Sequence, residues 1–134
     1  MVAVTYTVAF HGVEARPVEV QCAVAPGLPS FQIVGLANKA VSEARERVRA
    51  ALDALSIALP SKRITVNLSP ADMPKEGPHF DLPIAVALLS ALGMIPQEEI
   101  GACVLMGELA LGASWYRSPV ACPRHSPPQR RAAV

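Results

Sequence analysis

Cysteine is scarce in this sequence, and the cysteines that occur are not arranged for a common task. There are three, Cys22, Cys103 and Cys122, with no CxxC pair and no histidine at the spacing of a metal ligand. An odd number of scattered cysteines argues against a disulfide framework and against a structural zinc site. We therefore predict a reduced, cytosolic protein.

Long apolar runs are also lacking. The longest, residues 82–95, is interrupted by Pro83, Ser90 and Gly93, and it is shorter than the roughly 20 residues that a membrane-spanning helix needs. The first ten residues, MVAVTYTVAF, lack the basic segment of a secretory signal peptide. Both absences predict a cytoplasmic protein without a membrane partner.

The glycine-rich loops that bind nucleotides are missing as well. Neither GxxxxGK[ST] nor GxGxxG occurs in the 134 residues, and the first of these motifs is what surrounds a phosphate with backbone N–H groups and a lysine. In the turn PKEG, Lys75 precedes a single Gly77, and Asp81 would repel a phosphate. No Asp, Glu and His grouping has metal-site spacing either. We expect this chain to bind no cofactor and no metal by itself.

Acidic residues are absent from the last part of the chain. Residues 1–112 carry a net charge of −3, whereas residues 113–134 carry +4 and contain four of the 13 prolines. Just over half of all residues (51%) are apolar, which suits one domain with a core. The sequence therefore predicts a folded domain over 1–112 and a disordered basic tail over 113–134.

Five segments within the first part have the composition of strands. Apolar and polar residues alternate in the second and fourth, which is typical of a strand with one face in water. β-Branched or other apolar residues dominate the rest. The five segments are residues 3–10, 15–24, 31–35, 64–68 and 102–111.

Two segments predict helices. Residues 39–56 place apolar side chains at three- and four-residue steps, and Asn38 is a candidate N-cap. The second helix, residues 81–92, would begin with Asp81 as its N-cap and end before Gly93. Three strands, a helix, a strand, a helix and a strand predict an α+β fold, a two-layer α/β sandwich with a mixed sheet.

Three long motifs within residues 4–112 resemble one known family. They read GLPSFQIVGLANKAVSEARERVRAAL, PSKRITVNLSPADMPKEGPHFDLPIAVALL and MGELAL. In this order they closely resemble the N-terminal domain of the magnesium-chelatase-like AAA+ ATPases, the bacterial group that includes ComM and YifB. The resemblance implies a ribosomal S5 domain 2-like fold, which the proteolytic domain of Lon shares, with its last elements missing here.

The resemblance also implies partners that these residues do not contain. The intact parent would hydrolyse ATP with Mg²⁺ in a ring homo-oligomer, and the ComM branch would act on DNA during recombination or competence. This chain would then be a truncated accessory domain, its partner the parent's own ATPase domain. Because GELAL normally leads into a further turn and strand, we hypothesise a one-base frameshift near codon 112. The rival interpretation is a genuine short protein.

Whether the chain is an enzyme depends on the turn before the second helix. Lon-type proteases carry their nucleophilic serine just after a similar turn, and the corresponding position here is His79. Forming an acyl intermediate needs a hydroxyl or a thiol, which a histidine lacks. We therefore expect no catalytic residue in this chain, and a diverged Lon-like serine hydrolase is the alternative.

Four charged residues are candidates for partner or interdomain contacts. Lys75 and Glu76 lie on a turn expected to be exposed, and Arg45 and Arg49 lie on the charged face of the first helix. Acids are interleaved with these arginines, so the charge pattern favours a solvated face over a nucleic-acid footprint. A third interpretation, a stand-alone nucleic-acid-binding module, would use the basic tail.

Overall fold

Strands come first in the chain, and helices separate the later ones. The computed structural model describes residues 2–70, 73, 75, 77–109 and 120–121. Its elements are β1 (Val2–His11), β2 (Glu14–Ala25), β3 (Ser30–Val34), α1 (Asn38–Ala54), β4 (Arg63–Ser69), the 3₁₀ turn η1 (Pro78–Phe80), α2 (Asp81–Ala91), α3 (Gln97–Ile100), β5 (Val104–Leu105) and β6 (Val120–Ala121).

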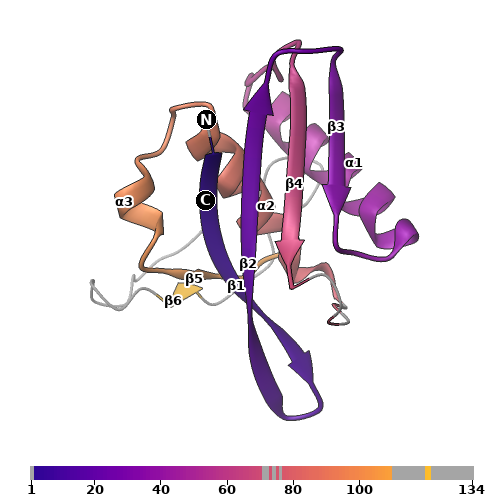
Figure 1. Cartoon of the computed structure of the whole chain (residues 1–134), viewed down its shortest axis with the longest axis vertical. Helices are drawn as coiled ribbons and strands as arrows, with labels where there is room; N and C mark the ends of the chain where they lie inside the picture. Colours follow the sequence, from indigo (N-terminus) through magenta and orange to yellow (C-terminus); the bar gives the residue numbers. More distant parts are fainter. Residues whose placement is uncertain (1, 71–72, 74, 76, 110–119, 122–134) are drawn as a thin grey trace.

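The strands form one mixed sheet in the order β3-β4-β2-β1-β5-β6. Neighbours β1/β2, β2/β4 and β5/β6 are antiparallel, and β3/β4 and β1/β5 are parallel. Helices α1 and α2 lie on the same face of this sheet (Figure 1). The prediction of an α+β fold, a two-layer sandwich with a mixed sheet, is confirmed.

The core fills the space between the sheet and these two helices. In β2, Val18, Val20 and Cys22 are buried, whereas Glu19 and Gln21 on the other face are partly exposed. The two-residue alternation read from the sequence therefore places the expected side chains inside.

Proline in β2 is tolerated because of where it lies along the strand. β2 is an inner strand, but β4 pairs with it only from Glu19 to Ala25, and Pro17 faces Val8 of β1 alone. The β1–β2 hairpin extends beyond the other described strands at this end (Figure 1). Among the described strands only β1 pairs with β2 at Pro17, so no strand on the other side needs a hydrogen bond from this position. The missing N–H therefore costs little.

Both helices begin differently from the prediction. Ala37 is the N-cap of α1, and Asn38 is its first helical residue. Asp81 is the first residue of α2 rather than its cap, because Phe80 before it is already helical, with φ −79° and ψ −11°. No side chain caps α2, and the carboxylate of Asp81 is used elsewhere.

The end of α2 confirms the prediction for Gly93. Gly93 has φ +84°, its N–H donates to Ser90 O (3.0 Å), and the next N–H, of Met94, donates to Leu89 O (2.9 Å). These are the two hydrogen bonds of a Schellman motif, which favours glycine at this position.

The strand predicted over 102–111 is mostly wrong over residues 102–109, and residues 110–111 lie outside the described residues. Only β5, two residues long, pairs with β1, and the preceding α3 was not predicted. The reason lies at Gly107, whose N–H donates to His79 O and whose carbonyl accepts from Leu82 N–H, both at 2.9 Å. The backbone here bonds to the start of α2 instead of extending the sheet.

Part of the predicted tail is paired. Val120 and Ala121 form β6 beside β5, whereas residues 113–119 and 122–134 lie outside the described residues. A disordered tail stays a prediction for them, and so does the boundary at residue 112.

The cysteine of β2 is part of the core. Cys22 is free and buried, and burial raises the pKa of its thiol to about 12. Cys122 lies outside the described residues, so the expectation of a reduced protein stays a prediction.

Candidate functional site

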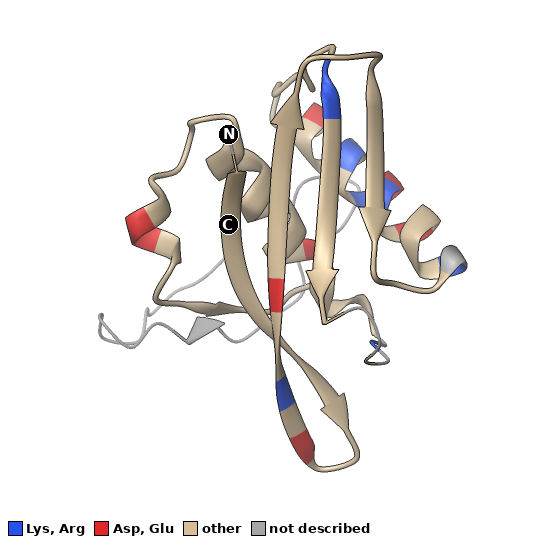
Figure 2. Ribbon diagram, in the orientation of Figure 1, with Lys and Arg blue, Asp and Glu red and all other residues tan. Residues whose placement is uncertain are grey.

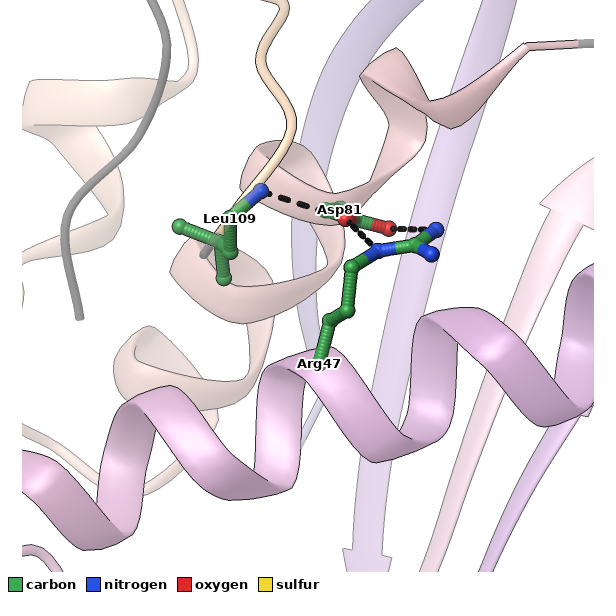
Figure 3. Close-up of polar contacts among 3 residues, drawn as sticks. All are labelled: Arg47, Asp81 and Leu109. Carbon is green, nitrogen blue, oxygen red and sulfur yellow. Dashed lines mark hydrogen bonds and ion pairs between the residues drawn. The ribbon is translucent and has the colours of Figure 1, made fainter. Parts of the chain in front are cut away.

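The turn before α2, where the resemblance places a Lon-type nucleophile, leads into an ion pair between a buried carboxylate and a partly exposed arginine (Figure 3). Asp81 is 1% exposed. Arg47 of α1 donates from Nε to Asp81 Oδ2 (2.5 Å) and from a terminal nitrogen to Oδ1 (3.1 Å). The backbone N–H of Leu109 donates to Oδ2 (3.2 Å). One carboxylate thus joins α1, α2 and the segment after β5.

Burial and pairing act on this carboxyl in opposite directions. Burial raises the pKa of Asp81, while the hydrogen bond and charge of Arg47 and the Leu109 N–H oppose the rise. The pKa of Arg47 is raised, chiefly by its hydrogen bond to Asp81. Because both carboxylate oxygens are occupied, the geometry gives Asp81 a structural role rather than one in acid–base chemistry.

His79 is held by the strand beneath it. Its Nε2 lies 2.7 Å from the carbonyl oxygen of Val8 in β1, and a carbonyl only accepts, so Nε2 carries the proton. The ring lies 4.2 Å from the Phe80 ring and 5.8 Å from the Phe10 ring, centroid to centroid. This histidine therefore bonds to the backbone of β1 and lies beside the rings of Phe10 and Phe80.

The backbone of this turn depends on one glycine. Gly77 has φ +104°, and a Cβ there would lie 3.0 Å from His79 Nδ1. A side chain at position 77 would therefore strain the backbone and press on the imidazole.

Residues 18–123 match the family described as subunit ChlI of Mg-chelatase. The chain belongs to the magnesium-chelatase-like family. It is 47% identical over 109 residues to the uncharacterised protein YifB of Salmonella typhimurium, covering 81% of this chain and 22% of the relative. It is 45% identical over 109 residues to the competence protein ComM of Haemophilus influenzae, covering 81% and 21%. An uncharacterised protein of Mycobacterium tuberculosis (strain H37Rv) is 40% identical over 106 residues, covering 79% and 21%.

The chain spans about a fifth of the length of these magnesium-chelatase-like relatives. The family match reaches residue 123, beyond the predicted boundary at residue 112.

In this member of the family, Lys75 is not exposed as expected. It is 6% exposed, and its Nζ donates to the carbonyl oxygens of Pro70 (2.5 Å) and Met73 (3.0 Å). The ammonium group binds the chain's own backbone, so the expected exposure is wrong, while a contact of Lys75 with a partner stays a prediction. Glu76 lies outside the described residues.

The other two predicted contact residues meet at β3. Arg45 donates to the carbonyl oxygen of Phe31 (3.2 Å). Arg49 is exposed, with its guanidinium carbon 5.9 Å from the centre of the Phe31 ring. The structure therefore brings both arginines to one edge of the sheet, away from the Asp81 turn.

Sequence reasoning missed Arg47 as a key residue. The sequence contained one indication of it: an acid at the start of an apolar, buried helix needs a cation as its partner. Over the part of the chain that the structure describes, no three His, Cys, Asp or Glu side chains are grouped to hold a metal ion. Within the same residues, no helix has the length and hydropathy to span a membrane.

Proposed function

We propose that this chain is the N-terminal accessory domain of a cytoplasmic magnesium-chelatase-like AAA+ ATPase and is not catalytic by itself. Its similarity to about a fifth of YifB and ComM supports a part of a larger protein. ATP and Mg²⁺ would then be bound by the rest of the parent, since GxxxxGK[ST] is absent from these 134 residues. A ring homo-oligomer and action on DNA would also belong to the parent.

The observation that carries the non-catalytic proposal is the use of the turn before α2. The position that matches the Lon-type serine by resemblance is His79, whose imidazole bonds to Val8. The nearby acid, Asp81, is occupied by Arg47 and Leu109. A Lon-like, S5 domain 2-like framework would thus be kept for its shape while the nucleophile is gone.

The experiment that tests membership of a larger ATPase is sequencing of the gene across codons 105–134 and beyond. We expect a GxxxxGK[ST] motif downstream, in the same frame or in one shifted near codon 112. A verified stop after codon 134 with no ATPase sequence behind it would overturn the proposal.

The hydrolase alternative is tested on the purified chain. We expect no cleavage of casein and no labelling by a serine-reactive phosphonate. Covalent labelling of one specific serine, lost when that serine is changed to alanine, would replace the accessory role by a Lon-like hydrolase.

The nucleic-acid alternative rests on the four arginines of residues 113–134. It predicts salt-sensitive DNA binding that vanishes when these residues are removed. We expect the chain alone to show no such binding at physiological salt.

A further inference from the structure

An open groove lies where α1 ends and where β3 and β4 begin. Its volume is about 520 Å³, which is within the range of ligand-binding pockets. Phe31 and Ile64, 5% and 1% exposed, line it from the sheet, and Ile57 and Leu59 line it from the loop after α1. Phe31 and Ile64 are core residues, so the apolar side chains left partly open in the groove are Ile57 and Leu59, which pack against that core.

Two cations lie on the rim of this groove. Arg49 of α1 and Lys62 before β4 are both exposed, and neither forms an ion pair with any described residue. In Figure 2 the blue at the start of β4 falls where that strand begins, at Arg63 next to Lys62, and α1 behind the sheet carries both blue and red segments. The acid among the lining residues is Asp53 of α1.

One polar atom of the groove lacks a partner. Ser30 Oγ is buried and makes no hydrogen bond within the described part of the chain. The Ser30 backbone N–H is engaged with Lys62 O at 3.3 Å. Because this oxygen is enclosed, a ligand in the groove does not contact it as the structure stands.

We propose that this groove binds a short peptide segment in which a large apolar side chain stands next to carboxylates. The apolar side chain would cover Ile57 and Leu59, and the carboxylates would face Arg49 and Lys62. Arginine favours such pairing because its guanidinium can bind a carboxylate through two hydrogen bonds. A nucleic-acid phosphate would satisfy the cations but leave Ile57 and Leu59 partly exposed to water, so the mixed lining favours a peptide. This inference does not depend on the accessory-domain proposal.

The test uses the full chain and a fluorescein-labelled peptide with one phenylalanine flanked by glutamates, followed by anisotropy. We expect saturable binding with a dissociation constant below about 1 mM, the weak end of specific recognition. Changing the peptide's phenylalanine to serine, or its glutamates to glutamines, should each weaken binding about tenfold or more. Equal binding of all three peptides would overturn the proposal.

Protein variants locate the site. Arg49→Glu should weaken binding about tenfold or more, whereas Arg16→Glu, the same charge change on the exposed β1–β2 hairpin, should leave it within about twofold. Both positions are exposed, so thermal melting should confirm that both variants fold. Lys62→Glu provides a second variant with the same expectation. Unchanged binding by Arg49→Glu and Lys62→Glu would place the peptide elsewhere.

A change at Asp53 should strengthen peptide binding, whereas the changes at Arg49 and Lys62 should weaken it. Asp53→Asn removes the acid from the groove, so the acidic peptide should bind a few-fold more tightly. Weaker binding by this variant would contradict the arrangement.

A second copy of the chain is the other possible occupant, and sedimentation tests for it. If the chain self-associates, if Arg49→Glu abolishes this association, and if no peptide binds, self-association would replace the peptide proposal.

Discussion

The two helices on the same face of the sheet have opposite characters. In α1 only a stripe is buried, and the rest of its surface is charged and exposed. In α2, nine of the 11 residues are buried, and it contacts β1, β2 and α1. We infer that α2 chiefly supports the fold, while the outer side of α1 is free to meet partners.

Among the described residues one ion pair, Arg47 with Asp81, joins the two helices, and breaking it should have the largest effect. Arg47→Met leaves the carboxylate of Asp81 buried without its cation, which costs about 3–5 kcal/mol of unfolding free energy. Arg45→Met, on the same helix, removes one hydrogen bond to a carbonyl and should cost about 1 kcal/mol. Urea unfolding of both variants measures the difference.

The double variant Arg47→Met/Asp81→Leu is the control for this contact. Removing both charges should recover part of the loss, because replacing a buried pair by apolar groups avoids the unpaired charge. The recovery stays incomplete since Leu109 N–H loses its acceptor. No recovery at all would mean that Arg47 acts through packing alone.

The same contact predicts a pH dependence. Burial raises the pKa of Asp81 in the folded protein, and Arg47 opposes that rise, so Arg47→Met should raise the pKa further. A carboxyl with a raised folded-state pKa favours folding below its unfolded-state pKa, and this contribution is lost as pH rises through the folded-state value. The deficit of Arg47→Met should therefore be largest at pH 7 and shrink on acidification. An equal deficit at pH 7 and pH 4.5 would contradict a charge mechanism.

The next-largest difference between the two helices should appear when one leucine of each is truncated to alanine. Leu88 of α2 is fully buried (0% exposed), so Leu88→Ala should cost about 2–5 kcal/mol through lost burial and a cavity. Leu55 at the end of α1 is 56% exposed, and Leu55→Ala should stay within about 0.5 kcal/mol. Similar losses in urea unfolding would show that α1 is buried in solution on a side that the structure leaves open.

Regular burial was predictable from the sequence, and long-range pairing was not. Val18, Val20 and Cys22 repeat with the period of a strand, so local pattern alone placed them inside. The cap predicted at Asp81 was wrong because an acid there can bond either to its own helix or to a distant cation, and Arg47 lies 34 residues away.

The candidate site shows the same limit. Arg45 and Arg49 were predictable as charged residues of a helix face, but their convergence on Phe31 depends on how α1 packs beside β3. Lys75 was misjudged because a polar turn residue is ordinarily exposed, whereas here Pro70 and Met73 direct their carbonyl oxygens at its ammonium group.

The left-handed residue after α2 is Gly93, whereas the one after α1 is Ser56. Substituting Gly93 should have a smaller effect on stability than the changes above. Gly93 after α2 has φ +84°, and a Cβ added there would meet nothing within 4 Å. Gly93→Ala should therefore cost about 1–2 kcal/mol through backbone strain alone. A shift in thermal midpoint measures it, and an unchanged midpoint would mean that the chain leaves α2 in another conformation.

The smallest expected effect is a gain at the end of α1. Ser56 has φ +63°, and the N–H groups of Ser56 and Ile57 donate to Asp53 O and Leu52 O, both at 2.9 Å. This is the same motif that ends α2, with serine where glycine is preferred. Ser56→Gly should raise the unfolding free energy by about 0.5–1 kcal/mol, because the relief of left-handed strain exceeds the entropy that glycine adds to the unfolded chain. Ser56→Ala keeps the strain and should show no gain, so equal midpoints for the Gly and Ala variants would show that α1 ends without this motif.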